Sequence, residues 1–303
     1  MARYRITHDT DYHYSAPVPH SQQLLHLQPR PLAYQHILSQ QLHITPPPTR
    51  ETADWDFFGN PCTHLEFTQP HLRLSVSAET HIEVMSRQWP EFAASAPWEQ
   101  VVEHCRYTGD PLGDELLAAL VFRQESPFGR IKHLFADFAA DCFLTGRPLL
   151  EATNALMLKI HSEFTFDAEA TQIATPLAQV LEERRGVCQD FAHLMMSCLR
   201  SLGLPARYVS GYLLTEPPPG QERLIGADAS HAWVSVYCPA LTTPADGAGE
   251  RWVDFDPTNA VLPGEQHITL GWGRDFSDVS PLRGVILGGG AHELVVRVTV
   301  MPE

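Results

Sequence analysis

Basic residues are scarce in this sequence. Its 303 residues include 21 Lys and Arg against 36 Asp and Glu, which gives a formal net charge of −15. Because a strongly acidic chain repels phosphate backbones, we expect no nucleic-acid partner. Hydrophobic residues make up 44% and charged residues 19% of the chain. This balance is typical of a globular protein and excludes a disordered one.

Long apolar runs are also absent. No run approaches the roughly 18–20 residues that cross a bilayer, so no membrane partner is expected. The first residues, MARYRITHDTDYHYSAP, alternate polar with apolar side chains and lack the continuous apolar core of a signal peptide. They predict a strand, and the cytoplasm is the compartment expected by default. The length allows one large domain or two to three smaller ones.

Closely spaced cysteines are missing as well. The six cysteines include no CxxC pair, which argues against a structural zinc site. Four of the histidines in the first 43 residues are candidate ligands and lack ligand spacing too, so we expect no metal and no other cofactor. In a cytoplasmic chain the thiols should be reduced and mostly buried. The cysteines are Cys62, Cys105, Cys142, Cys188, Cys198 and Cys238, and the histidines are His20, His26, His36 and His43.

Residues 1–86 predict a β-rich N-terminal domain. Arg3–His8 and Leu72–Ala78 alternate polar and apolar side chains at the period of a strand. Gln41–Thr45 is a third such run, and the three prolines that follow it end the pattern. Gly59-Asn60-Pro61 is a turn signal between two further apolar stretches. Short strands separated by turns are typical of a small antiparallel sandwich.

Residues 87–303 predict a second, α+β domain. Its helical part, 87–206, shows apolar residues at helical spacing, most clearly in Cys188–Leu202, which ends at a glycine. Its sheet part, 207–303, contains strand patterns at 207–214, 232–238, 251–255 and 292–300, with a polar loop at 242–250. The expected fold is α+β, with a helix bearing Cys188 packed on an antiparallel sheet and a β-sandwich-like domain before it.

Cys188 differs from the other cysteines because it opens a long apolar helix. The first backbone N–H groups of a helix have no intrahelical partner, and the helix dipole places partial positive charge there. Both effects favour the thiolate, which is the reactive form of cysteine. A cysteine beside an apolar helix is otherwise more often a packing residue. Its partners therefore decide between the two interpretations.

A thiol nucleophile needs a base, and the base needs an orienting group. His231 stands at the start of one predicted strand and Asp256 at the end of the next. If the two strands are antiparallel neighbours, these residues lie close together at one edge of the sheet. Asp254 is two residues before Asp256 and competes for the orienting role, because it shares the same face of a regular strand.

Four blocks of this sequence resemble the bacterial transglutaminase-like superfamily, whose members are often described as candidate cysteine proteases. They are Gly186–Ala192, Gly203–Tyr212, His231–Val234 and Phe255–Asn259, and they occur in the family's order. Each block alone is weak, but four in order are specific.

Two further stretches extend the resemblance over nearly the whole chain. Asp56–Asn60 is similar to part of the β-rich N-terminal region that accompanies these domains, and Gly273–Val279 is similar to their C-terminal part. The resemblance implies a papain-like arrangement in which Cys188 is the nucleophile, His231 the base and Asp256 the residue that orients it. Asp256 is preferred to Asp254 because it matches the family's Asp-Pro-Thr block.

The resemblance implies a cysteine-dependent peptidase or amidase that acts on a peptide or protein substrate through a thioester. One alternative is a transglutaminase, in which an amine intercepts the thioester. Calcium activation is not expected, because no EF-hand loop is visible. Another alternative is a protein-binding module that keeps the fold without turnover. The intact Cys188, His231 and Asp256 argue against it.

Three neighbours of the triad are candidates for substrate binding: Trp233, Asp190 and Tyr212. Each also has a simpler structural interpretation. Trp233 could be a core residue, and Asp190 could be an acidic residue favoured by the dipole at a helix start. Tyr212 is most simply a packing residue of its strand. The sequence assigns no oligomeric state.

Overall fold

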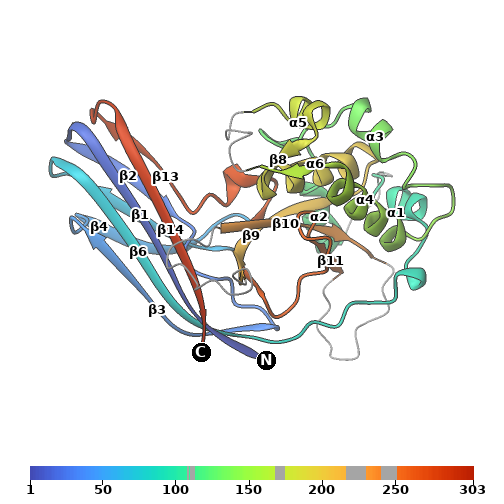
Figure 1. Cartoon of the computed structure of the whole chain (residues 1–303), viewed down its shortest axis with the longest axis horizontal. Helices are drawn as coiled ribbons and strands as arrows, with labels where there is room; N and C mark the ends of the chain where they lie inside the picture. Colours follow the sequence, from blue (N-terminus) through green and yellow to red (C-terminus); the bar gives the residue numbers. More distant parts are fainter. Residues whose placement is uncertain (108, 110–112, 168–174, 216–229, 240–250) are drawn as a thin grey trace.

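The computed structural model describes all residues except 108, 110–112, 168–174, 216–229 and 240–250. The loop predicted at 242–250 lies outside the described residues. A long β-sandwich forms one side of the molecule, and a unit of helices packed on a smaller sheet forms the other (Figure 1). The predicted α+β fold, with a β-rich part and a helix bearing Cys188 packed on a sheet, is confirmed.

Two four-stranded antiparallel sheets make up the sandwich. One has the strand order β14-β1-β6-β3 and the other β13-β2-β5-β4. Burial alternates along the strands, as in β6, where Val76, Ala78, Ile82 and Val84 face the core. The strands are β1 (Ala2–Val18), β2 (His20–Leu25), β3 (Gln35–Thr45), β4 (Arg50–Trp55), β5 (Pro61–Phe67), β6 (His71–Val84), β13 (Leu282–Leu287) and β14 (His292–Pro302).

The last two strands belong to the sandwich. β14 pairs with β1 and β13 pairs with β2, both antiparallel. The sequence analysis placed residues 207–303 together as the sheet part of the second domain, so the structure differs there. An alternating pattern shows that a strand is half-buried, but it does not name the neighbouring strand. Here Val298 and Val300 join Tyr4 and Ile6 of β1 in one apolar cluster.

The second unit is organised around one helix. In α6 all residues from Asp190 to Arg200 are buried, because α3, α4 and α5 flank it on one side and the sheet covers the other. In the described part of the chain, no helix has the length and apolar character needed to cross a membrane. The helices are α1 (Trp98–His104), α2 (Asp114–Val121), α3 (His133–Ala139), α4 (Leu149–Glu163), α5 (Leu177–Glu183) and α6 (Cys188–Ser201), with short 3₁₀ turns η1 (Phe92–Ala94) and η2 (Phe276–Asp278).

The sheet beneath α6 has the strand order β11-β10-β9-β12. The predicted antiparallel pairing that joins the His231 strand to the Asp256 strand is present as β10 with β11. The fourth strand, β12, was not predicted: all seven of its residues are buried, so it shows no alternation. The strands are β9 (Ala206–Leu213), β10 (Ser230–Tyr237), β11 (Trp252–Phe255) and β12 (His267–Gly273), and two short strands, β7 (Thr165–Phe166) and β8 (Arg185–Gly186), form a separate pair.

Asn60 joins the sandwich to this sheet. Its amide accepts a hydrogen bond from the Trp272 backbone N–H (3.0 Å) and donates one to the Trp272 carbonyl (2.8 Å). Arg30 donates to the same amide oxygen at 2.9 Å and lies over the Trp272 ring at 3.8 Å. Since Asn60 is only 1% exposed, water cannot replace these bonds.

We expect Asn60→Ala to lower the free energy of unfolding by about 2–4 kcal/mol, because it leaves two buried backbone groups of Trp272 without partners. Urea unfolding followed by tryptophan fluorescence measures this loss. Asn154→Ala, at a half-buried position of α4, is the matched control and should change stability by about 0.5 kcal/mol or less. Equal losses in the two variants would contradict the junction role of Asn60.

Candidate active site

Cys188 is the first residue of α6 and the one cysteine of the six that is not buried. Its Sγ lies 3.9 Å from the carbonyl oxygen of Ser230, which precedes His231. The carboxylate of Asp190 accepts a hydrogen bond from the Val187 backbone N–H at 2.9 Å and so fixes the start of the helix. The helix terminus thus presents the thiol to the sheet edge that carries the histidine.

His231 and Asp256 meet at that edge. The His231 Nε2 lies 2.8 Å from the Asp256 Oδ2, and the two side chains are 8% and 0% exposed. With Nε2 engaged by the carboxylate, Nδ1 is the ring nitrogen left for the Cys188 thiol. The structure therefore brings the three predicted catalytic residues into one chain of contacts.

Asp256 is held by several donors besides His231. Its Oδ1 accepts hydrogen bonds from the backbone N–H groups of Thr258 (2.9 Å) and Asn259 (3.3 Å), and its Oδ2 accepts one from the Asn259 side chain (2.7 Å). The sequence analysis did not identify Asn259 as a site residue. Its position three residues after an aspartate that ends a strand is the signal for such a turn.

His267 is a second histidine on the same carboxylate, and it was also not identified from the sequence. Its Nε2 lies 3.1 Å from Asp256 Oδ2, and its Nδ1 faces the Gly264 backbone N–H at 3.4 Å. Because a backbone N–H can only donate, the ring proton sits on Nε2 and is donated to Asp256. No sequence signal connects His267 to the triad, since it arrives on the unpredicted strand β12.

Asp254, the competitor of Asp256, has other partners. Its Oδ2 accepts hydrogen bonds from Arg87 at 2.6 Å and from the Trp233 indole N–H at 3.1 Å. Arg87 also lies over the Tyr34 ring at 3.5 Å. Asp254 is thus a buried structural ion-pair partner, whereas Asp256 is the carboxylate bonded to His231.

The three residues predicted to bind substrate are all buried. Trp233 is fully buried against Val209 and bonded to Asp254, and Asp190 fixes the start of α6. Tyr212 packs toward the sandwich, where its hydroxyl lies 2.9 Å from the Nδ1 of His8. A substrate role for these residues stays a prediction.

The charges of the triad reinforce each other. Burial lowers the pKa of His231, but the hydrogen bond to Asp256 and the contact with the Cys188 thiol outweigh it and raise that pKa to about 10. Burial also opposes ionisation of Asp256, yet the bonds from His231 and His267 hold its pKa below the usual range. Burial lowers the pKa of His267, which keeps that ring neutral. The arrangement is an imidazolium that lies between the Asp256 carboxylate and the Cys188 sulfur.

The other five cysteines are buried, which confirms the prediction that they are packing residues. Burial raises the pKa of Cys105 and of Cys142 to about 11, and it raises those of Cys62 and Cys198 as well. These thiols are therefore protonated near neutral pH.

His231, Asp256 and His267 also form a set that could hold a metal ion, since their ligand atoms lie within 4.8 Å of one another. Two imidazoles and one carboxylate suit zinc or another transition metal. Metal bound there would take the place of the two imidazole protons on Asp256. It would therefore occupy the base that the thiol requires.

Comparison with known families accounts for most of the chain. Residues 4–83 match the family described as the bacterial transglutaminase-like N-terminal region. Residues 136–257 match the family described as the transglutaminase-like superfamily, and this stretch includes Cys188, His231 and Asp256.

An uncharacterized protein of Mycobacterium tuberculosis is 38% identical over 301 residues, which cover 99% of this chain and 93% of the relative. A protein-glutamine gamma-glutamyltransferase of Pseudomonas aeruginosa is 34% identical over 85 residues, 28% of this chain and 11% of that protein. A crystal structure from Cytophaga hutchinsonii, described as a candidate cysteine protease, has a TM-score of 0.71 at 20% identity and covers 100% of this chain and 90% of its own. At this identity the structural likeness shows the fold alone.

We expect His267→Leu to slow alkylation of Cys188 by iodoacetamide at pH 7 by about threefold to tenfold, because Asp256 loses a charge-assisted hydrogen bond. His267→Gln, whose amide can donate in the same direction, should recover most of the rate. A pH–rate profile measures both effects. His133→Leu, at an exposed position of α3, is the control, and a loss as large there as in His267→Leu would count against the positioning role.

The stability of the protein should fall as the pH rises from 6.5 toward 10. An unfolded histidine releases its proton near pH 6.5, whereas folded His231 keeps it up to about pH 10. The stabilisation that protonated His231 contributes is thus complete below pH 6.5 and is lost progressively between pH 6.5 and about 10. We expect urea midpoints between pH 6.5 and 9 to decline less steeply in His231→Gln than in the unmodified protein. Parallel declines would refute the raised pKa.

Proposed function

Because this chain belongs to the transglutaminase-like superfamily, we propose that it is a cysteine-dependent peptidase or amidase that cleaves a peptide or isopeptide bond. The observation that carries this proposal is the position of His231, whose Nε2 lies 2.8 Å from Asp256 and whose ring contacts the Cys188 thiol. The likeness in fold to the candidate protease from Cytophaga hutchinsonii is consistent with it.

The first half-reaction forms a thioester. The proton shared by the pair resides on His231, and the Cys188 sulfur attacks the carbonyl carbon of the amide. The backbone N–H of Cys188 at the helix start can donate to the resulting oxyanion. The imidazolium then gives its proton to the amide nitrogen, the C–N bond breaks, and the amine leaves.

The second half-reaction releases the acyl group. His231 takes a proton from water, the hydroxide attacks the thioester carbon, and the C–S bond breaks to give a carboxylic acid and free Cys188. A primary amine could attack in place of water and form a new amide. The short match to the Pseudomonas gamma-glutamyltransferase keeps this outcome as the second candidate.

Alkylation tests whether the site is reactive at all. We expect iodoacetamide to label Cys188 at least about tenfold faster than the other five thiols at pH 7, because a thiolate reacts and a thiol does not. His231→Ala should remove most of that advantage, with the sites of labelling identified by peptide mass spectrometry. If Cys188 reacts no faster than a free thiol, or reacts equally fast in the unmodified protein and in His231→Ala, the protein is a binding module of this fold.

Product analysis then separates hydrolysis from transfer. Casein incubated with the protein and a fluorescent primary amine should show new α-amino groups or released ammonia, without incorporated amine. Cys188→Ser should show none of these products. Incorporation of the amine that depends on Cys188 would replace hydrolysis by transglutamination as the function.

A further inference from the structure

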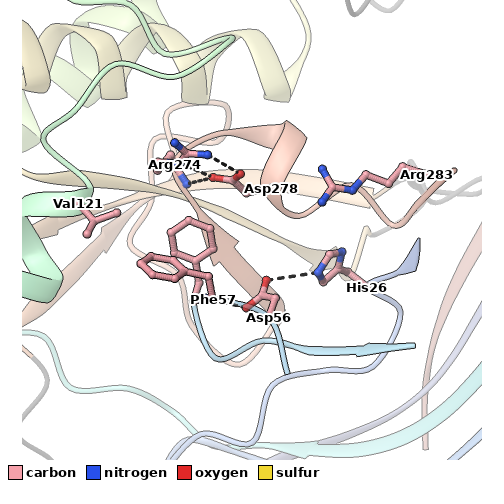
Figure 2. Close-up of a pocket in the computed structure, with 8 residues that line it drawn as sticks. His26, Asp56, Phe57, Val121, Arg274, Asp278 and Arg283 are labelled. Carbon is pink, nitrogen blue, oxygen red and sulfur yellow. Dashed lines mark hydrogen bonds and ion pairs between the residues drawn. The ribbon is translucent and has the colours of Figure 1, made fainter. Parts of the chain in front are cut away.

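A cavity of about 430 Å³ lies where the sandwich meets the catalytic unit (Figure 2). This volume falls within the range of small-ligand sites. Two sequence blocks that the triad does not use converge there, namely the turn at Asp56–Asn60 and the stretch Gly273–Val279. His26 at the end of β2 and Val121 at the end of α2 complete the walls.

The turn at Asp56–Asn60 holds an aromatic ring at the cavity in an exposed position. Phe57 is 81% exposed, although apolar side chains of this size are usually covered. Its exposure is fixed by the backbone, because Asp56 Oδ1 accepts hydrogen bonds from the N–H groups of Phe58 and Asn60, both at 2.8 Å. Gly59, with φ of 71°, allows the chain to close the turn. The ring is therefore preorganised for contact with a ligand.

The two acidic groups of the cavity both have partners within its wall. Arg274 donates two hydrogen bonds to the Asp278 carboxylate, at 2.9 and 3.0 Å. The Nε2 of His26 lies 3.3 Å from the Asp56 carboxylate. Dashed lines in Figure 2 mark both pairs. These groups shape the cavity wall, and the pairing of Arg274 with Asp278 neutralises the Asp278 charge.

Arg283 supplies a positive charge without a counter-ion. Its side chain is exposed and donates one hydrogen bond to the Ser277 carbonyl, and no carboxylate of the described residues forms an ion pair with it. Figure 2 shows Arg283 and His26 on one side of the cavity and the aromatic rings on the other. A guanidinium is suited to a carboxylate, which it can bind through two parallel hydrogen bonds.

The cavity wall is attached to the helix that carries the nucleophile. The Phe276 backbone N–H donates to the Nε2 of His193 at 3.2 Å, and the Phe276 ring contacts Tyr208. Arg274, which lines the cavity, accepts a hydrogen bond at its carbonyl from Arg200 at 2.6 Å. Arg200 lies twelve residues after Cys188 in α6, which is about 18 Å along the helix axis. A peptide gains about 3.4 Å per extended residue. The cavity and the thiol are therefore parts of one packed unit, separated along the helix by about the length of five extended residues.

We propose that this cavity is a recognition subsite for a peptide carboxylate next to an apolar side chain. Arg283 binds the carboxylate, and Phe57 and Phe58 contact the apolar group. The inference rests on the proposed action on peptides, and it adds the substrate class: peptides with an apolar C-terminal residue, or with an acidic residue beside an apolar one. Both sources offer the same chemistry, and the experiment distinguishes them.

Three fluorescein-labelled hexapeptides test this in the Cys188→Ala protein, which cannot turn them over. One is a pentaalanyl-phenylalanine with a free C-terminal carboxylate, the second is its C-terminal amide, and the third is an amide that ends in Glu-Phe. In fluorescence anisotropy, the first or the third should bind about tenfold more tightly than the second, because a charge-assisted pair is gained. The tighter of the two identifies the source of the carboxylate.

Arg283→Gln should abolish that preference, and Phe57→Ala should weaken the preferred peptide by at least about threefold. Arg73→Gln and Phe166→Ala, which change exposed residues of β6 and β7, are the matched controls. Melting temperatures verify that each variant is folded. Equal binding of the three peptides, no binding, or a preference that survives Arg283→Gln would overturn the inference.

Alkylation of Cys188 in the Arg283→Gln protein with its native thiol separates this inference from the proposed function. A rapid rate, equal to that of the unmodified protein, shows that the thiol site works independently of the cavity. A slow rate in the unmodified protein itself would overturn the catalytic proposal, while the peptide preference would still be read from anisotropy.

Discussion

The buried charge of Asp256 is the constraint on which the site depends. An unpaired carboxylate with no exposed surface would be very unfavourable. The fold compensates it with the backbone N–H groups that follow it, with Asn259 and with two imidazoles. These donors come from three different local structures. The turn after β11, the start of β10 and the start of β12 must all be in place before the carboxylate is satisfied.

The same carboxylate links structure to reactivity. Asp256 keeps a proton on His231, and the charged ring contacts the Cys188 side chain at the start of α6. Burial raises the pKa of four other thiols and so holds them in the neutral form: Cys62, Cys105, Cys142 and Cys198. The surroundings of each cysteine therefore decide whether its thiol is reactive or inert.

Much of the site could be predicted because its central residues stand at element boundaries. A cysteine that opens an apolar helix, a histidine that begins a strand and an aspartate that ends the next strand are visible in the sequence. His267 was not visible, since β12 is buried on both faces and has no period-two pattern. The place of β13 and β14 also could not be predicted, because burial patterns do not specify which strands pair.

The pairing of β14 with β1 connects residues almost 300 positions apart, from Tyr4 with Pro302 to Tyr14 with His292. Contacts of such separation form slowly, because a very long loop must close before they contribute. During synthesis β1 emerges before β14, and the chain that forms the catalytic unit lies between them in the sequence (Figure 1). The catalytic unit can therefore assemble first, and the sandwich closes around the junction only when the last strand is released. Until then β1 is an open edge, which makes the interval before completion the period in which this chain is most exposed to misassociation.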